Sequence, residues 1–278
     1  MTLSKSDFDL IKAALVEDLA GGEDITSVAT IDEKATAKAD FTARKSGVIA
    51  GIEVAEAVLR EVGLTEIKRV KNDGDQVSAG DILLSVSGNT RAILLAERTA
   101  LNFFSQLSGV ATLTSAWVKE VAGTKCQVRD TRKTTPGMRV LEKYAVRMGG
   151  GTNHRMNLSD AALIKDNHIA AAGGVVAAFS QVRAKFPSAP IEIEVDTLEQ
   201  LKEVLPLKPD LVLLDNMSPQ QCAEAVAIAA GSCKLEASGG ITLENAKSYA
   251  LSGVDYLAIG ALTHSAPVLD IGLDLRVE

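Results

Sequence analysis

IEIEVDTLEQLKEVLPLKPDLVLLDN, residues 191–216, carries the pattern that decides the fold of this chain. Two short apolar runs, at 191–195 and 211–214, are typical of strands that are buried on both faces. The segment between them, 198–205, predicts a helix. A strand, a helix and a second strand in this order are the repeating unit of parallel α/β proteins.

The same alternation extends in both directions along the chain. We predict strands at 125–129, 161–165, 191–195, 211–214, 234–237 and 256–259, and helices at 136–148, 175–185, 198–205, 219–230 and 243–251. Pro136 and Pro219 suit first helical turns, and Ser218 and Thr242 are N-cap residues. Six strands alternating with helices allow either a barrel or a doubly wound sheet.

The chain before about residue 91 has a different texture. We predict helices at 6–19 and 53–62, strands at 35–43, 47–50, 67–71 and 82–87, and two further helices, 92–107 and 112–121, separated near Gly109. All seven prolines fall at or after Pro136. These contrasts predict an N-terminal α+β domain over residues 1–110, with a small, mostly antiparallel sheet, and an α/β domain over 111–278. The C-terminal tail is a candidate to pack on the first domain.

Composition limits the class of protein. Of the 278 residues, 46% are hydrophobic but only 4% are aromatic, which predicts a core of Ala, Val, Leu and Ile. Three cysteines without a CxxC spacing argue against a disulfide framework or a zinc site and favour buried, inert thiols. The N-terminus lacks a secretory h-region and no apolar run has membrane-spanning length, so we expect a cytoplasmic protein that binds no membrane.

Residues 129–168 form a basic island in an acidic protein. They hold eight of the 29 Lys and Arg residues, two of the three His residues and only four acids. The segment therefore has a net charge of +4, whereas the chain has −7. A solvated helix face would explain an ordinary charge run, but these charges lie beside turn residues such as Thr-Thr-Pro-Gly. The pattern favours a pocket for a small polyanion over a nucleic-acid surface.

Polar residues follow the predicted strands at their C-terminal ends, where barrel enzymes hold their active sites. They are Asp130, Arg132, Lys133, Lys165, Glu194, Asp215, Ser238, Gly239, Gly240 and Gly260.

The residue types at these ends predict distinct roles. Ser238-Gly239-Gly240, between a strand and a helix, is suited to bind a phosphate through its backbone N–H groups. Gly260-Ala261 with His264 forms a second candidate phosphate-binding loop after the next strand. A tight turn that needs glycine is the alternative. Glu194 and Asp215 suit Mg²⁺ and ribose hydroxyls, the alternative being an ion pair with Lys165.

The remaining cations suit a ligand with planar carboxylates. They are Arg132, His154, Arg155 and Lys165. Arginine can hold a carboxylate through two parallel hydrogen bonds. His168 fits a structural role and a ligand contact equally well.

Nine motifs, in order, carry a resemblance to a known family. They are ERTALNFFSQLSGVAT (97–112), DTRKTTPG (130–137), EKYAVR (142–147), GGGTNHR (149–155), LIKDNH (163–168), EIEVD (192–196), LLDN (213–216), EASGGI (236–241) and GALTHSAP (260–267). Together they resemble the signature of quinolinate phosphoribosyltransferase, the decarboxylating enzyme that makes nicotinate mononucleotide. The first 90 residues match more loosely, through EDLAGGEDITS (17–27) and RKSGVIAG (44–51).

The resemblance implies an irregular, seven-stranded α/β barrel with an N-terminal α+β sandwich domain. It implies a glycosyltransferase (a pentosyltransferase) of NAD biosynthesis that uses quinolinate, phosphoribosyl pyrophosphate and Mg²⁺. Lys133, Lys165, Glu194 and Asp215 would be the catalytic residues, with Glu194 and Asp215 holding Mg²⁺ directly or only the ribose.

The resemblance also implies a homodimer, or a larger assembly, with shared active sites. Arg98 would reach the neighbouring subunit's substrate pocket; the alternative is a surface arginine paired with Glu97 or Glu56.

Three other functions stay open from the residues themselves. A related barrel protein associated with molybdate transport shares the Arg-Lys-Thr and Gly-Gly-Gly elements. A lyase could use Lys165 as a Schiff-base nucleophile at a strand end. A non-enzymatic sensor could bind a phosphate ligand at the same loops.

Overall fold

The computed structural model describes residues 2–277, which divide into two compact units. Unit 1 contains the residues up to Ser115, Thr135–Gly150 and the residues from Ser265 on. Unit 2 contains Ala116–Thr134 and Gly151–His264. Each unit is therefore assembled from segments that are far apart in the sequence.

Unit 2 is built on a parallel sheet of six strands in the order β6-β11-β10-β9-β8-β7. The strands are β6 (Gln127–Arg129), β7 (Ala162–Ile164), β8 (Ile191–Val195), β9 (Leu211–Asp215), β10 (Lys234–Ser238) and β11 (Tyr256–Ala258). Thr152 adds an isolated parallel bridge to Arg129 at the β6 edge, and the described residues form no seventh strand there. The six predicted strands are confirmed.

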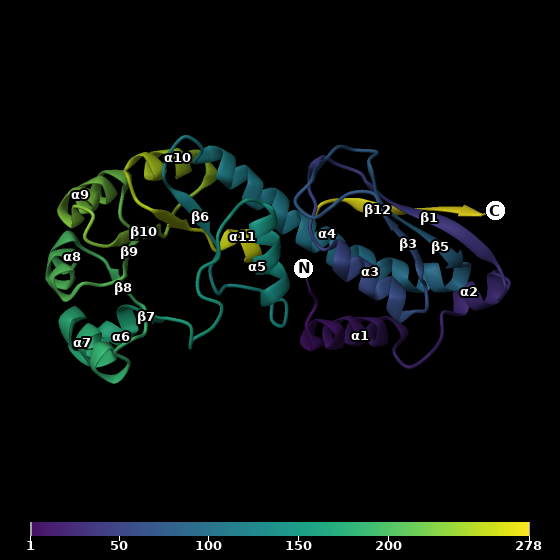
Figure 1. The fold of residues 1–278 in the computed structure, drawn as a ribbon, viewed down its shortest axis with the longest axis horizontal. Coiled ribbons are helices and arrows are strands. Elements are labelled where there is room, and N and C mark those ends of the chain that lie inside the picture. The colour runs from purple at the N-terminus through teal and green to yellow at the C-terminus, as the bar shows by residue number, and fades with distance from the viewer. Residues whose placement is uncertain (1, 278) are drawn as a thin grey trace. The chain divides into compact units, whose positions relative to one another are not determined.

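Helices connect these strands and lie along their outer side (Figure 1). They are α6 (Asp166–Ala172), α7 (Val175–Lys185), α8 (Leu198–Val204) with the 3-10 turn Leu205–Leu207, α9 (Pro219–Ala229) and α10 (Leu243–Leu251). The short helix α11 (Ala261–His264) follows the last strand, β11. Ser218 and Thr242 are the N-caps of α9 and α10, as predicted. Strand β8 is buried along its whole length, as expected for a strand covered on both faces.

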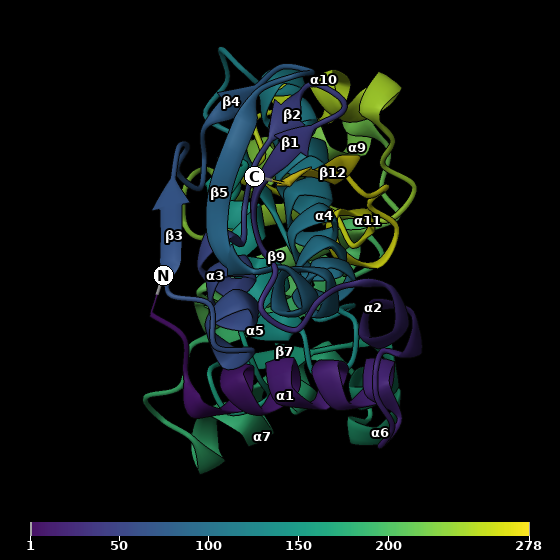
Figure 2. The same ribbon diagram turned by 90° about the vertical axis from the view of Figure 1, so that its right-hand side faces the viewer.

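Unit 1 contains a four-stranded antiparallel sheet in the order β12-β1-β5-β3 (Figure 2). Its elements are α1 (Lys5–Leu19), α2 (Ile25–Thr30), β1 (Thr36–Ala43), β2 (Gly47–Val48), α3 (Ile52–Glu61), β3 (Glu66–Arg69), β4 (Gln76–Val77), β5 (Ile82–Asn89), α5 (Arg139–Met148) and β12 (Ile271–Val277). Strands β2 and β4 form a separate two-stranded pair. The C-terminal segment enters this unit as β12, which pairs with β1.

The predicted break near Gly109 is wrong, because a single helix, α4 (Thr90–Glu120), runs through it. A Cβ atom at Gly109 would lie 2.2 Å from the carbonyl oxygen of Pro267. The glycine therefore allows a close approach of the 267–268 backbone and does not end the helix.

The predicted start of α5 at Pro136 is also wrong. Gly137 has a φ of 81°, so the Pro136–Gly137 pair forms a turn, and the helix begins at Arg139. The short elements α2, α6, α11, β4 and β12 were not predicted. Within residues 2–277, no helix is both long and apolar enough to cross a membrane.

Candidate active site

The C-terminal ends of the unit 2 strands line a polar cavity of about 450 Å³, here called the outer cavity. Ten of the predicted site residues line it: Lys133, Lys165, Glu194, Asp215, Ser238, Gly239, Gly240, Gly260, Ala261 and His264. Parallel strands present their C-terminal ends at one edge of a sheet, which is why residues from Lys133 to His264 meet here.

Two glycine turns shape one wall of the outer cavity. Gly239 has a φ of 87°, and a Cβ atom there would lie 2.1 Å from Oδ1 of Asn216. The turn leads into the N-terminus of α10, where backbone N–H groups favour anions. At Gly260, a Cβ atom would meet Lys133 Cδ at 3.0 Å and His264 Nε2 at 3.1 Å. The absence of a side chain at Gly260 therefore lets Lys133, His264 and a backbone loop converge.

Three carboxylates lie at the ends of β8 and β9. Oxygen atoms of Glu194, Asp196 and Asp215 all lie within 4.8 Å of one another. Burial raises the pKa of Glu194 and of Asp215, and the charge of Asp196 adds to the effect at Asp215. Asp196 was not predicted as a site residue. It could have been, because side chains two positions apart on an extended chain share a face and Glu194 was predicted.

Lys165 directly follows β7, as the N-cap of α6, and faces these acids. Its Nζ lies 3.8 Å from Oε2 of Glu194, and its side chain is 49% exposed. The ion pair considered as an alternative therefore forms, but it is too open to be the only reason for these charges. On the neighbouring loop, Thr263 Oγ1 donates to the carbonyl oxygen of Lys133 at 2.7 Å and so fixes the backbone of that lysine.

A second, smaller cavity of about 260 Å³, the inner cavity, shares residues with the outer one. Both are lined by Thr131, Lys133, Lys165, Leu213, Ser238 and Ala258. The inner cavity adds Arg132, His154 and Arg155, the residues predicted to bind carboxylates. The two cavities are thus connected parts of one site.

The arginines of the inner cavity hold unused donors. The Nε atoms of Arg132 and Arg155 are buried and have no hydrogen-bond partner among residues 2–277. Arg155 Nη1 donates to the carbonyl oxygen of Ala161 at 2.9 Å, which orients the side chain. Burial and the charge of Arg132 lower the pKa of Arg155. Two half-buried arginines with free Nε donors in one cavity are suited to bind a dianion.

A buried ionic cluster forms part of the inner cavity, and the sequence analysis missed its acids. Nε2 of His154 lies 2.6 Å from Oε2 of Glu192 and 3.6 Å from Oε1 of Glu236. Arg129 Nη1 donates to Oε2 of Glu236 at 3.0 Å and stacks on Tyr256. The signal was available, because charged residues inside the buried strands β8 and β10 are unusual.

Asp130 holds the loop that carries His154. Its side chain is fully buried, and Oδ1 accepts a hydrogen bond from the His154 backbone N–H at 2.8 Å. Its other oxygen accepts from the side-chain amide of Asn153. Asp130 therefore acts on the site through the backbone.

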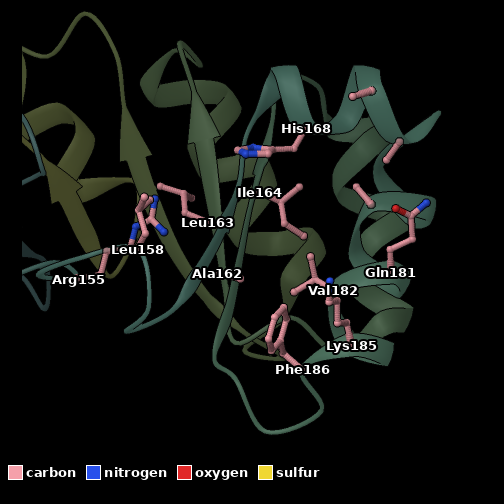
Figure 3. A pocket seen from close by; sticks show the side chains of 13 residues that line it. Arg155, Leu158, Ala162, Leu163, Ile164, His168, Gln181, Val182, Lys185 and Phe186 are labelled. Atoms are coloured by element: carbon pink, nitrogen blue, oxygen red, sulfur yellow. The ribbon is translucent and has the colours of Figure 1, made fainter.

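His168 has a structural contact. Its Nδ1 accepts a hydrogen bond from the Lys165 backbone N–H at 3.0 Å, at the start of α6. The side chain lines a different, largely apolar cavity of about 520 Å³ beside β7 and α7, together with Ile164, Val182 and Phe186 (Figure 3). Arg155 lies at the edge of this cavity as well (Figure 3).

Arg98 belongs to unit 1 and lines a separate cavity there. That cavity, of about 460 Å³, includes Glu17 and Asp18 of α1 and Asn102 of α4. The predicted alternative partner, Glu56, pairs with Arg69 and Arg60.

Comparisons with known proteins agree with this geometry. Models of the N-terminal and C-terminal domains of quinolinate phosphoribosyl transferase match residues 24–108 and 110–274. A nicotinate-nucleotide pyrophosphorylase [carboxylating] of Mycobacterium leprae is 53% identical over 96% of each chain. A mitochondrial quinolinate phosphoribosyltransferase [decarboxylating] of Nicotiana tabacum is 40% identical over 97% of this chain and 82% of its own.

A solved structure gives the same result in three dimensions. The crystal structure of NadC from Streptococcus pyogenes matches with a TM-score of 0.95 and 40% sequence identity, over 100% of this chain and 99% of that one. Agreement in both domains, in sequence and in fold, means that this chain belongs to the quinolinate phosphoribosyl transferase family.

Proposed function

We propose that this chain transfers the phosphoribosyl group of phosphoribosyl pyrophosphate to quinolinate, with loss of CO₂, in the biosynthesis of NAD. The products are nicotinate mononucleotide, CO₂ and pyrophosphate. The observation that carries the proposal is the joined pair of cavities, one with glycine turns and carboxylates and one with two buried, unpartnered arginine Nε atoms. The names of the M. leprae and tobacco relatives support the same reaction over a Schiff-base lyase or a transport-associated protein.

Each cavity takes one substrate in this scheme. Arg132, Arg155 and His154 hold the two carboxylates of quinolinate, and the ring nitrogen faces the outer cavity. The turn at Ser238–Gly240 and the loop of His264 hold the phosphate, while Lys133 and Lys165 hold the pyrophosphate. The ring nitrogen displaces pyrophosphate at the anomeric carbon, and Glu194 and Asp215 stabilise the positive charge that develops on the ribose. Positioning supplies much of the rate enhancement.

The carboxylates of the outer cavity fit Mg²⁺. Three oxygen-bearing side chains within 4.8 Å of one another are the kind of ligand set this hard cation prefers. Glu194 and Asp215, with the newly identified Asp196, would hold the ion. When bound, the ion would neutralise charge on the pyrophosphate group.

The exposed Arg98 supports a homodimer with shared sites. Among residues 2–277 it forms no ion pair, and it lines a cavity whose walls combine the acidic Glu17 and Asp18 with apolar residues such as Phe103. An arginine from a second subunit would add a third cation to the dicarboxylate site. The cytoplasmic location expected from the sequence is part of the same proposal.

The test is a Mg²⁺-dependent assay that follows CO₂ and pyrophosphate from both substrates. Both products should appear in equal amounts, and omission of either substrate should abolish both. Release of pyrophosphate without consumption of quinolinate would contradict the proposal. Borohydride trapping of a substrate on Lys165 would favour a lyase instead.

A further inference from the structure

The interior of the unit 2 barrel has a charged layer beneath its mouth. Glu194 of β8 and Ser238 of β10 lie at the mouth. Glu192 and Glu236 precede them by two residues, so they share the same face of each strand, one layer deeper. Barrel interiors are usually filled by aliphatic side chains, because buried charges cost several kcal/mol each in lost solvation. A deep charged layer calls for a chemical reason.

The proposed reaction has a step for which the residues assigned so far supply no group. When the carboxylate beside the ring nitrogen leaves as CO₂, the carbon–carbon bond breaks and its electron pair stays on ring carbon 2. That carbon must then take a proton to give the nicotinate ring. Arg132 and Arg155 cannot supply it, because a guanidinium group does not give up its proton in proteins. Nε2 of His154 is held by Glu192 at 2.6 Å, and Lys165 pairs with Glu194 and holds the pyrophosphate in this scheme.

Glu236 has the geometry of a proton donor to this carbon. It lines the inner cavity with Arg132, His154 and Arg155, and its side chain is only 1% exposed. Its Oε2 accepts a hydrogen bond from Arg129, whereas Oε1 has no hydrogen-bond partner among residues 2–277. This oxygen lies 3.6 Å from Nε2 of His154 and makes no hydrogen bond among residues 2–277. In the wall of the cavity that would hold the ring, it is placed to exchange a proton with the ligand.

The surroundings of Glu236 favour its protonated form. The groups that face it are Arg129 from β6, His154 from the loop after Thr152, and Glu192 from β8. Burial and the charge of Glu192 raise the pKa of Glu236 to about 7, against the opposing effects of His154 and Arg129. A carboxyl group raised in this way still carries its proton in a large fraction of molecules at neutral pH.

We propose that Glu236 is the acid that protonates ring carbon 2 after CO₂ departs. The carbon–carbon bond breaks, the electron pair left on carbon 2 takes the proton from the Glu236 carboxyl group, and Glu236 becomes a carboxylate beside Arg129 and His154. Solvent returns the proton once the product leaves. This inference rests on the proposed function, because it needs quinolinate in the inner cavity.

The experiment uses Glu236→Gln, which keeps the shape and loses the acid. The matched control is Glu224→Gln, an exposed change on α9 of the same unit. In single-turnover reactions we expect Glu236→Gln to slow product formation about 100-fold, the lower end of what general acids contribute, while quinolinate binding changes less than about threefold. Wild type and the control should be equal.

A second readout separates proton donation from positioning. If the carbanion waits for a proton, CO₂ can add back to it. With ¹³C-bicarbonate and added pyrophosphate, Glu236→Gln should therefore place ¹³C in recovered quinolinate faster than wild type does. Product formation within threefold of wild type would overturn the proposal. So would a loss of quinolinate binding equal to the loss of rate without ¹³C exchange, which would make Glu236 a residue that only positions His154.

The wild-type enzyme keeps the proposal testable if the variant does not fold. The donor must be protonated, so the single-turnover rate should fall as the pH rises through about 7 and should be slower in D₂O. A rate that is flat across that range and equal in both solvents would overturn the proposal. Absence of any wild-type turnover would instead contradict the proposed function itself, so the two failures can be told apart.

Discussion

The outer and inner cavities of unit 2 bind negative charge by different means. The outer cavity uses glycine turns and the exposed side chains of Lys133, Lys165 and His264. The inner cavity uses arginines whose Nε atoms are buried, with His154 held between Glu192 and Glu236. Water screens the exposed side chains of the first set more than these buried donors. We therefore expect the arginines of the inner cavity to tolerate exchange for another cation less well than the lysines of the outer cavity.

The carboxylates of the outer cavity differ from its lysines, because we expect their substitution to cause the largest loss of turnover. Glu194→Gln and Asp215→Asn should each lower turnover about 1000-fold, the upper range for loss of one electrostatic contact in a transition state. The thermal midpoint should barely move, because burial already raises the pKa of both groups and so makes their charges unfavourable. Turnover and thermal unfolding, with exposed Glu199→Gln as the control, check this.

The opposite pattern would assign these acids to structure. If their main role is to pair with Lys165, loss of either should reduce stability by about 3–5 kcal/mol. A large drop in midpoint with residual activity at high Mg²⁺ would contradict the catalytic assignment.

The inner cavity gives the next largest effect. Arg132→Ala or Arg155→Ala should cost about 2–4 kcal/mol, read as a roughly 30- to 800-fold loss of kcat/KM for quinolinate. Arg→Lys should rescue little, because an ammonium group cannot reproduce the planar fork. Measurement of both substrates matters, since KM for phosphoribosyl pyrophosphate should change much less. Near-normal quinolinate turnover in both alanine variants would place the dicarboxylate elsewhere.

A backbone change in the outer cavity should have a smaller effect. Gly239→Ala puts a Cβ atom 2.1 Å from Asn216 Oδ1, and the Asn216 amide donates to Asp215. We expect KM for phosphoribosyl pyrophosphate to rise about tenfold, since local strain of this kind costs on the order of 1–3 kcal/mol. Gly231→Ala is the matched control, because its φ is 79° and nothing lies within 4 Å. An equal KM for phosphoribosyl pyrophosphate in the two variants would show that the close contact at Gly239 does not affect binding.

Mixed dimers of two variants test whether Arg98 completes the inner cavity of a second subunit. Their expected activity differs from wild type less than in any of the tests above. Arg98→Ala and Lys165→Ala should each be nearly inactive alone. In a mixture, about half of the dimers are hybrids with one intact site of two, so activity should return to roughly a quarter of wild type. Native mass measurement must show the hybrids. Hybrids without recovered activity would mean that Arg98 acts within its own chain or only structurally.

The alternation of strands and helices in unit 2, and the polar residues that follow its strands, could be predicted from local sequence alone. Apolar runs such as 191–195 and 211–214 predict strands that are buried on both faces. Polar residues directly after such strands must lie at one edge of a parallel sheet. The outer cavity follows from this rule with little further information, because each of its residues is placed by its own strand.

Features that depend on contacts between distant residues could not be predicted from the sequence and were seen only in the folded structure. Gly109 looked like a helix break until the 267–268 backbone was found against it, and β12 pairs with β1 across more than 200 positions. The meeting of His154 with Glu192 and Glu236 is of the same kind, since three segments supply it. Periodicity reports which face of a strand is buried, but not which buried charge another strand will bring to meet it, because that depends on strand order and register.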